Sequence, residues 1–416
     1  MANDSNNKVL ISRCRRPPSS PDWASLPSGI LDLILDRLIQ VVDYLRFSAV
    51  CKPWLSAALY QKDRRRRESI IHNQSVPMLL TPPLPPKKAA GDHHRRWKLY
   101  SVTSGKLLNW DQLKMVARRP PNQRLCGSSY GWLGAVNEDS SITFFNPFSG
   151  TCVRFPRAHP CPPQINLRDP AWENYLFEKQ VLKFVCSSDP NNFELFDGDF
   201  LIGTIFGSYD DFAYIKPGSS GWTYISSTRP RGFTDAVYHL GKFYLVDNYC
   251  CVTSVDVSTG GTGRDTTTTE AKPPHVEVVL PPTDSRTRRV YLVVSSGGED
   301  LLLVHAIPHP TRWQTTGFKI FKLLGLDSAD HKKFAELVEI NNLGNDALFL
   351  GDNHSLCVSA SNSRGCRPNC IYYINDCQDT NVYNLEDRSF TPLKGIKTRL
   401  RRTGHPPPIW IVPTLL

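Results

Sequence analysis

The sequence lacks any apolar run close to the roughly 18 residues that a membrane-spanning helix needs, so we expect no membrane partner. Residues 1–16 are polar and basic, and they lack the apolar stretch of a secretory signal. We therefore expect a protein of the nucleus or the cytoplasm. The composition, with 40% hydrophobic and 21% charged residues, is ordinary for a soluble globular protein. A length of 416 residues is enough for two or three domains.

The sequence also lacks any pair of cysteines in the C-x2-C spacing that is common at structural zinc sites. Its 12 cysteines are scattered, mostly beside apolar residues. The one local group, Cys366, Cys370 and Cys377, offers three ligands where a structural zinc site takes four. We therefore expect reduced cysteines packed in a core, no metal and no cofactor.

Two catalytic motifs are missing as well, the G-x-x-x-x-G-K-[ST] phosphate loop and the H-E-x-x-H zinc motif. One motif is present, because residues 127–131 match the G-x-S-x-G nucleophile elbow around Ser129. That elbow works only where a strand turns sharply into a helix, whereas residues 132–136 continue as a predicted strand. We therefore expect no catalytic residue. A hydrolase that uses Ser129 as its nucleophile is kept as an alternative function, ranked below the two binding functions given at the end of this section.

The net charge of +10 suggests nucleic-acid binding, but the positive charge is not spread over the chain. Residues 1–120 hold 21 Lys and Arg against 9 Asp and Glu, and the rest holds 28 against 30. Strands that bind RNA interleave basic and aromatic residues, and no such stripe occurs here. We expect no nucleic-acid partner. The densest basic run is a candidate nuclear-import signal formed by Arg64, Arg65, Arg66 and Arg67.

Composition divides the chain into four segments. Residues 1–21 are predicted to be a disordered basic tail. Residues 22–67 are rich in leucine at helical spacing. Residues 68–96 are a proline-rich and basic linker that should hold neither a helix nor a central strand. Residues 97–416 alternate short apolar runs with Gly, Asn, Asp and Ser, which is typical of strands and turns.

The leucine-rich segment predicts helices with more apolar surface than they can bury alone. Leu31, Leu35 and Leu38 lie at i, i+4 and i+7, and a second apolar stripe runs from Phe47 to Ala58. Pro53 lies inside that stripe, so its helix should kink or begin close to this residue. About 40 residues cannot cover so many large side chains. The proline-rich linker that follows separates this segment from the large domain. We therefore expect a partner protein, and not the large domain, to bury these side chains.

The order of these residues resembles an F-box. The match runs from Leu26-Pro27 through Ile30-Leu31, Ile34-Leu35 and Leu38, to Asp43–Phe47 and Val50-Cys51-Lys52-Pro53-Trp54. The resemblance implies binding to a Skp-type adaptor, and through it to a cullin and RING scaffold. The residues assigned to the adaptor-binding surface are Leu26, Pro27, Ile30, Leu31, Ile34, Leu35, Leu38, Leu45, Val50, Cys51, Trp54 and Leu55. The alternative is a helical hairpin packed on its own domain.

The large segment predicts a ring of small sheets. A strand–turn–strand pattern recurs, for example around Gly150, and an apolar hairpin turns at Gly241. At about 40–50 residues per four-stranded blade, 320 residues would make about six or seven blades of a β-propeller. Residues 409–412 form a good strand that should close the ring. A β-sandwich pair is the structural alternative.

The segments Gly131-Trp132-Leu133, Asn146-Pro147-Phe148, Leu348–Gly351, Cys370–Tyr373 and Pro408-Ile409-Trp410 resemble the domain found behind the F-box of kelch-like plant proteins. The predicted fold is thus α+β and multidomain: a small three-helix F-box, then a mostly-β, propeller-like domain. The resemblance implies a non-catalytic substrate-recognition subunit of a Skp–cullin–F-box ubiquitin ligase, with an unknown protein target. The alternative is a propeller-type scaffold, nuclear or cytosolic, whose F-box assembles no ligase.

Overall fold

The computed structural model describes most of the helical segment and of the strand-rich segment. The described residues are 23–38, 41–67, 76–81, 97–109, 123–137, 139–147, 151–158, 181–190, 200–206, 211–219, 221–225, 232–257, 274–283, 289–311, 314–326, 334–361, 365–374, 380–393, 396 and 408–413. The predicted tail, residues 1–21, lies outside them.

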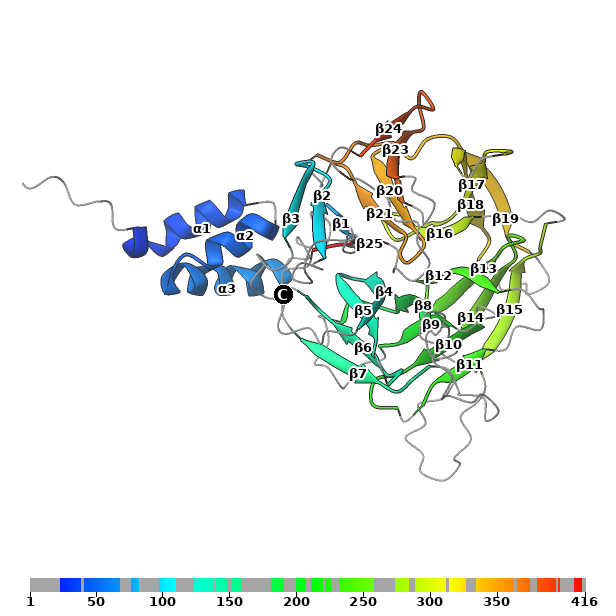
Figure 1. The fold of residues 1–416 in the computed structure, drawn as a ribbon, viewed down its shortest axis with the longest axis horizontal. Helices are drawn as coiled ribbons and strands as arrows, with labels where there is room; N and C mark the ends of the chain where they lie inside the picture. The colour runs from blue at the N-terminus through cyan, green and yellow to red at the C-terminus, as the bar shows by residue number, and fades with distance from the viewer. Residues whose placement is uncertain are drawn as a thin grey trace, which may run out of the picture.

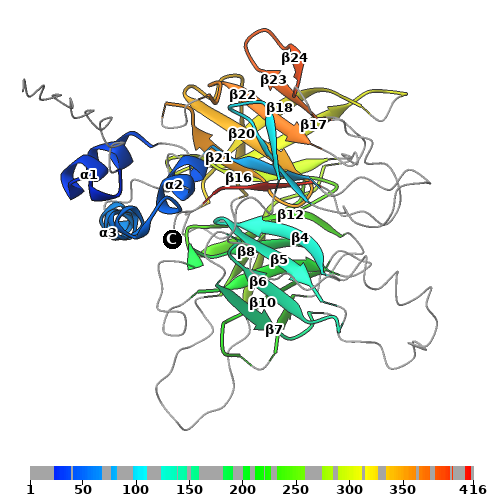
Figure 2. The ribbon, with the colours of Figure 1, turned by 60° about the vertical axis from the view of Figure 1, so that its left-hand side comes forward.

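Three α-helices precede the strands, and they lie outside the ring that the strands form (Figures 1 and 2). A short 3-10 helix, η1 (Trp23–Ser25), comes first, followed by α1 (Ser28–Arg37), α2 (Val41–Ser48) and α3 (Lys52–Arg67). Pro53 lies in the first turn of α3, where a missing backbone N–H costs no intrahelical hydrogen bond. The expectation that a helix begins close to Pro53 is therefore confirmed.

The three helices share a small apolar core. Its buried members come from all three helices: Leu31 and Leu35 from α1, Tyr44 and Phe47 from α2, and Ala58 from α3. The Tyr44 hydroxyl donates a hydrogen bond to the Ala58 carbonyl, which ties α2 to α3. These helices fit together through one side each, so the opposite sides remain on the surface.

Six sheets form a propeller, and we number the blades in chain order (Figure 1). From the inner edge outward the strands are β25 (Ile409–Ile411), β1 (Met78–Thr81), β2 (Lys98–Ser101) and β3 (Lys106–Asn109) in blade 1; β4 (Arg124–Ser129), β5 (Trp132–Val136), β6 (Ile142–Phe145) and β7 (Cys152–Phe155) in blade 2; β8 (Val181–Cys186), β9 (Ile202–Phe206), β10 (Asp211–Ile215) and β11 (Thr223–Ile225) in blade 3; β12 (Phe233–His239), β13 (Lys242–Asp247), β14 (Val252–Asp256) and β15 (His275–Leu280) in blade 4; β16 (Val290–Val294), β17 (Leu301–Pro308), β18 (Thr315–Leu324) and β19 (Glu336–Ile340) in blade 5; β21 (Leu356–Ser359), β20 (Asp346–Gly351), β22 (Cys370–Ile374), β23 (Thr380–Asn384) and β24 (Phe390–Pro392) in blade 6.

Each blade packs against both of its neighbours through apolar side chains. Six buried clusters occur in the strand region, and each takes its residues mainly from two adjacent blades, so that the clusters run once around the ring. Between blades 2 and 3, for example, the Phe184 ring of blade 3 packs against Gly134 of blade 2, and its centroid lies 6.3 Å from that of Phe144. A closed ring of sheets is a propeller and not a pair of stacked sheets, so the β-sandwich alternative is wrong. The predicted number of six or seven blades resolves to six.

The C-terminal strand closes the ring, as the sequence predicts. Strand β25 pairs antiparallel with β1, with Trp410 opposite Leu79. Trp410 is fully buried, and its indole N–H donates to the Leu350 carbonyl of blade 6 at 3.0 Å. Blade 1 therefore combines strands from both ends of the strand region, and this join fastens it to blade 6.

One boundary needs correction. The segment interpreted as a linker, residues 68–96, contains β1, which lies between β25 and β2 in the middle of blade 1. Prolines flank this strand at positions 77 and 82 but do not fall within Met78–Thr81. Those four residues keep their backbone N–H groups, so they can join a ladder on each side. The propeller therefore begins before residue 97.

Blade 6 departs from the plain four-stranded pattern. Strand β20 pairs in parallel with β22, and β21 folds back antiparallel on the inner side of β20. The turn that reverses the chain between β20 and β21 consists of residues 352–355. This turn enters the centre of the ring, as its contacts below show.

Candidate functional site

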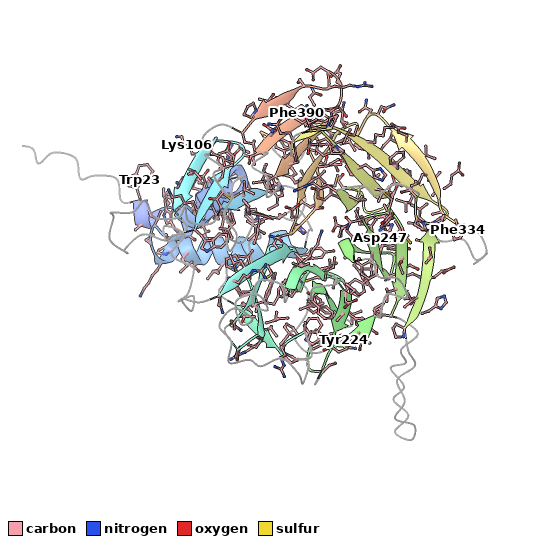
Figure 3. All side chains as sticks on the ribbon, turned by 45° about the vertical axis from the view of Figure 1, so that its right-hand side comes forward. Trp23, Lys106, Tyr224, Asp247, Phe334 and Phe390 are labelled. Atoms are coloured by element: carbon pink, nitrogen blue, oxygen red, sulfur yellow. The ribbon has the colours of Figure 1, made fainter. Side chains whose placement is uncertain are left out.

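The helical segment carries many large apolar side chains that are exposed. The large apolar residues that are exposed there are Trp23, Ile30, Leu33, Val50, Leu55, Leu59 and Tyr60. Figure 3 labels Trp23, which projects from the helices with 60% of its surface exposed. Burying a side chain of this size contributes about 1.5–3 kcal/mol, so a surface of this kind is suited to a partner protein. We call these seven residues the helical apolar surface.

The structure separates the predicted adaptor-binding residues by exposure. Pro27, Ile30, Val50 and Leu55 are exposed. Partly buried members are Leu26, Ile34, Leu38, Cys51 and Trp54. Leu31 and Leu35 lie in the helical core, where they can support the surface but do not form it. The side chain of Leu45 lies outside the described residues. The binding role of the whole set stays a prediction.

Sequence reasoning missed four members of the helical apolar surface, namely Trp23, Leu33, Leu59 and Tyr60. A signal for one of them was present, because Leu59 lies four residues after Leu55 and residues at this spacing share one side of a helix. The inward residues Trp54 and Ala58 have the same spacing one position earlier. The F-box pattern identifies the helices, but it does not by itself separate outward from inward leucines.

Hydrogen bonds and ring contacts hold this surface in shape. The Trp54 indole N–H donates to the Trp23 carbonyl at 2.8 Å, which fastens η1 to α3. The Trp54 ring packs on Phe47 with ring centroids 4.5 Å apart. The backbone N–H groups of Ile30 and Leu31 donate to the Pro27 carbonyl, so the Leu-Pro pair begins α1. The apolar rows on α1 and α3 are therefore presented on fixed helices.

The candidate import signal lies at the C-terminal end of α3. Helix α3 extends to Arg67, so the backbone of Arg64, Arg65, Arg66 and Arg67 is helical. Cationic residues are favoured in the last turn of a helix, where the macrodipole is negative. An import role for the four arginines stays a prediction.

A second group of functional side-chain types lies at the centre of the ring. Lys183 on β8 and Asp235 on β12 form an ion pair, and each is almost fully buried. The Asp235 carboxylate also accepts hydrogen bonds from the Leu292 backbone N–H of blade 5 at 3.0 Å and from the Ser355 hydroxyl of blade 6 at 3.3 Å. Burial lowers the pKa of the Lys183 ammonium group. This one carboxylate thus links four blades.

The turn of residues 352–355 fills the centre of the ring beside this ion pair. The Asp352 carboxylate accepts from the Arg289 guanidinium at 3.0 Å. With its amide nitrogen toward the available acceptors, Asn353 donates to the Leu182 carbonyl at 3.0 Å and to the Cys126 carbonyl at 3.3 Å. The turn therefore contacts blades 2, 3, 4 and 5. Its polar groups and those of the ion pair are used within the protein, which favours a structural role over a catalytic one.

The central turn predicts a specific dependence of stability on acidity. Burial, together with the nearby Lys183 ammonium group, lowers the pKa of His354 from 6.5 to about 3. Below pH 6.5 the unfolded chain binds a proton at this residue, whereas the folded protein does not until about pH 3. The free energy of unfolding should therefore fall as the pH drops from 6.5 toward 3, by up to about 1.4 kcal/mol per pH unit from this group.

Urea unfolding at pH 7, 6 and 5 would measure this effect. The His354→Asn variant removes the titrating group, so its stability should fall less between pH 7 and pH 5 than that of the parent. An equal loss in both proteins would contradict the assignment to His354.

The Ser129 hypothesis finds no support in the local fold. Ser129 ends β4, and a two-residue turn leads into the strand β5, not into a helix. Its hydroxyl is buried and accepts a hydrogen bond from the Cys186 backbone N–H at 3.1 Å. The strand-to-helix geometry of a nucleophile elbow is therefore missing at this position.

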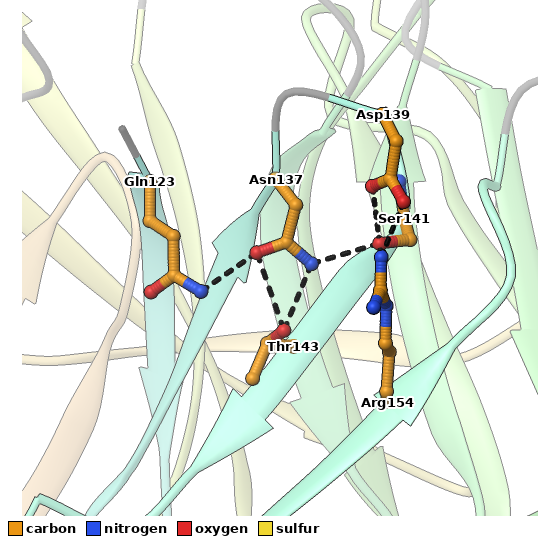
Figure 4. A network of polar contacts seen from close by, with 6 residues as sticks. All are labelled: Gln123, Asn137, Asp139, Ser141, Thr143 and Arg154. Atoms are coloured by element: carbon orange, nitrogen blue, oxygen red, sulfur yellow. Dashed lines mark hydrogen bonds and ion pairs between the residues drawn. The ribbon is translucent and has the colours of Figure 1, made fainter. Parts of the chain in front are cut away.

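A polar cluster on blade 2 holds other residue types that occur in active sites, but its bonds stabilise a turn. Figure 4 shows its members, which are Gln123, Asn137, Asp139, Ser141, Thr143 and Arg154. The Asn137 amide donates to the hydroxyls of Ser141 and Thr143 at 2.8 and 2.9 Å. Asp139 accepts from Ser141, which lowers the pKa of this carboxyl group. The cluster thus fixes the chain between β5 and β6.

Two further expectations concern metals and membranes. In the part of the chain that the structure describes, no group of three His, Cys, Asp or Glu residues could hold a metal ion. Cys366 and Cys370 are free and buried, whereas Cys377 lies outside the described residues. Within the same residues, no helix is both long and apolar enough to cross a membrane.

Comparison with known proteins agrees with this architecture. The family model described as the KIB1-4 beta-propeller matches residues 99–384, which is more than half of the chain. The chain belongs to this family. Its matched region begins within β2 and ends with β23, so it takes in most of the propeller but neither the helices nor the closing strand.

Relatives of this KIB1-4 propeller protein extend the likeness to the helices. A putative F-box protein of Arabidopsis thaliana is 25% identical over 91% of this chain and 95% of its own length. Another F-box protein of that plant is 23% identical over 86% of this chain and 96% of its own. F-box protein SKIP23, also from Arabidopsis thaliana, is 23% identical over 88% of this chain and 86% of its own. The predicted resemblance to plant F-box proteins with a C-terminal propeller is confirmed.

Proposed function

We propose that this protein is the non-catalytic substrate-recognition subunit of a Skp–cullin–F-box ubiquitin ligase. The helices bind a Skp-type adaptor, which connects them to a cullin and RING scaffold, and the propeller holds a protein target. The observation that carries this proposal is the helical apolar surface, which stands outside the ring on helices with their own core. The names of the relatives as F-box proteins support it.

Such a subunit contributes to the reaction by holding the reactants close together. It brings the lysines of a target close to a ubiquitin-charged enzyme, and holding two reactants together can replace a slow encounter by an intramolecular step. No nucleophile of its own is needed. The polar groups at the centre of the ring form hydrogen bonds within the protein, which is consistent with a non-catalytic role. We propose that the protein acts in the nucleus or the cytoplasm.

Adaptor binding is the first test, and the exposed row on α3 gives the sharpest variant. The full chain should co-purify with a Skp-type adaptor, and the Leu55→Asp/Leu59→Asp variant should bind it at least about 100-fold more weakly. Two carboxylates would have to leave water inside an apolar interface, which costs several kcal/mol. Both positions are exposed, so the helices should still fold.

A matched control lies on the propeller, where Phe334→Asp changes an apolar residue that is somewhat more exposed than Leu55 and Leu59, and this change should leave adaptor binding intact. A folded parent chain that does not bind the adaptor would contradict the proposal. That outcome favours a propeller-type scaffold whose F-box assembles no ligase. A bound protein whose lifetime does not depend on the proteasome would support the same reading.

A further inference from the structure

Two turns of the propeller hold large side chains in a backbone conformation that such residues avoid. Tyr130 and Gly131 join β4 to β5 with φ angles of 49° and 78°. Leu240 and Gly241 join β12 to β13 with φ angles of 45° and 81°. Two-residue turns with both φ angles positive favour Asn, Asp or Gly at the first position. A Tyr or a Leu is strained there, because its Cβ crowds the carbonyl oxygen.

Neither side chain belongs to a buried core cluster of the described residues. The side chain of Tyr130 is 42% exposed and that of Leu240 is 53% exposed. The other described residues with positive φ, apart from Gly, are small, polar or charged: Ser140, Cys250, Asn369 and Arg388. Strain that stability does not require is found mainly at functional sites. The two turns therefore carry a signal of binding.

The two turns lie on one face of the propeller, with the end of β8 of blade 3 between them. Strands β4, β8 and β12 are the inner strands of three successive blades, and Figure 1 shows them side by side. Partial burial and the electrostatic influence of Cys186, Asp189 and Tyr238 raise the pKa of Tyr130 to about 12. Tyr238 lies two residues before Leu240 on β12. The Tyr130 hydroxyl is therefore within electrostatic range of residues on β8 and β12.

The described residues of the inner turns on this face include acidic residues but no basic ones. In blades 2 to 5 the described turn residues are 130–131, 187–190, 200–201, 240–241 and 295–300. They include Asp189, Glu299 and Asp300 but no Lys, Arg or His. Asp189 is buried and Asp300 is paired with Lys322 at 2.7 Å, whereas Glu299 is exposed.

We propose that these turns form a protein-binding surface centred on Tyr130 and Leu240, and that its partner is a protein segment with an apolar side chain next to Lys or Arg. Leu240 offers apolar contact area. Tyr130 and Tyr238 offer aromatic rings, which attract cations, on the same face of the propeller as the exposed Glu299. Tyrosine is also enriched among residues that dominate binding energy. The partner is the degradation target only if the proposed function holds, whereas the surface itself does not depend on the helices.

A library of random 12-residue peptides displayed on phage, selected on the full chain, would test the chemistry of the partner. Selection should enrich peptides with Lys or Arg beside Leu, Ile or Phe. A synthetic copy of one enriched peptide would then be titrated by fluorescence anisotropy. Its Kd should rise at least about 10-fold when each Lys or Arg is replaced by Glu. Enrichment of acidic peptides, or of none, would overturn the proposal.

Substitution by Asn separates binding from stability at both turns. Tyr130→Asn and Leu240→Asn should each raise the Kd of the selected peptide at least about 10-fold. Because Asn accepts a left-handed conformation, their melting temperatures should stay equal or rise by about 1–3 °C. Variants that bind the peptide as tightly as the parent would show that the surface lies elsewhere.

Arg388→Asn is the matched control, since Arg388 has a φ of 56° on the turn between β23 and β24 of blade 6. It relieves similar strain away from the surface and should leave the Kd unchanged; an equal rise there would contradict the assignment. Adaptor binding is measured in parallel. Peptide binding without adaptor binding would refute the ligase role alone, and adaptor binding without peptide binding would refute the surface alone.

Discussion

The Trp410→Ala variant should lose about 3–5 kcal/mol of the propeller's free energy of unfolding. Trp410 is fully buried between blades 1 and 6, with its ring perpendicular to that of Phe349 at 5.1 Å. Removing an indole from such a site leaves a cavity that the surrounding strands fill only in part. The Leu350 carbonyl also loses its donor, which adds the cost of an unsatisfied buried group.

Position in the ring makes this residue more important than an average core tryptophan. Strand β25 is joined to the rest of blade 1 only through β1, and Trp410 fastens the same strand to blade 6. The Trp410 carbonyl also accepts from the Ser128 hydroxyl of blade 2. A loss at this residue therefore weakens the closure of the ring as well as one core cluster.

Urea unfolding followed by near-ultraviolet circular dichroism measures the effect, and two further variants calibrate it. Trp410→Phe keeps most of the volume and loses one hydrogen bond, so it should cost about 1–2 kcal/mol. Phe334→Ala, at a side chain that is 58% exposed, should change the free energy by no more than about 0.5 kcal/mol. A Trp410→Ala loss as small as that of Phe334→Ala would show that β25 does not hold the ring closed.

The ring could be predicted from the sequence because its signals are local. Alternating strands and tight turns recur at intervals that suit small sheets, and the apolar run at 409–412 stands alone at the end of the chain. Strand β1 escaped prediction because it has four residues and prolines just outside both ends. At this length the flanking prolines give the stronger local signal, although neither removes an N–H from the ladder.

The centre of the ring could not be predicted, because its contacts join residues that are far apart in the chain. Lys183 and Asp235 are 52 positions apart, and Ser355 follows Asp235 by 120. Lys183 and Asp235 each stand in a strand of mostly apolar residues. That placement marks each residue as unusual, but it does not identify the residue that pairs with it. The helices show the same limit on a smaller scale, since spacing locates both apolar rows but does not say which one a partner covers.

The Lys183→Met variant should destabilise the protein by about 3–5 kcal/mol, since it leaves the buried Asp235 carboxylate without its counter-charge. Methionine fills a similar volume, so a cavity contributes little. The carboxylate keeps its bonds from the Leu292 and Ala236 backbone N–H groups and from the Ser355 hydroxyl, but three neutral donors do not offset a buried negative charge. Lys242→Met is the matched control, because Lys242 pairs with Asp256 at 3.6 Å in a partly exposed position. It should cost less than about 1 kcal/mol.

A double variant separates charge from shape at the same site. In Lys183→Met/Asp235→Asn the buried charge is gone, while an amide oxygen remains to accept from Leu292 and Ser355. This protein should be more stable than Lys183→Met alone by at least about 1 kcal/mol, although it carries one more substitution. Stability that falls further would mean that the carboxylate matters to the ring independently of Lys183. Higher stability of the double variant than of Lys183→Met would show that the two buried charges are tolerated because each neutralises the other. The packing of the four blades around Asp235 would then require that this site carry no net charge.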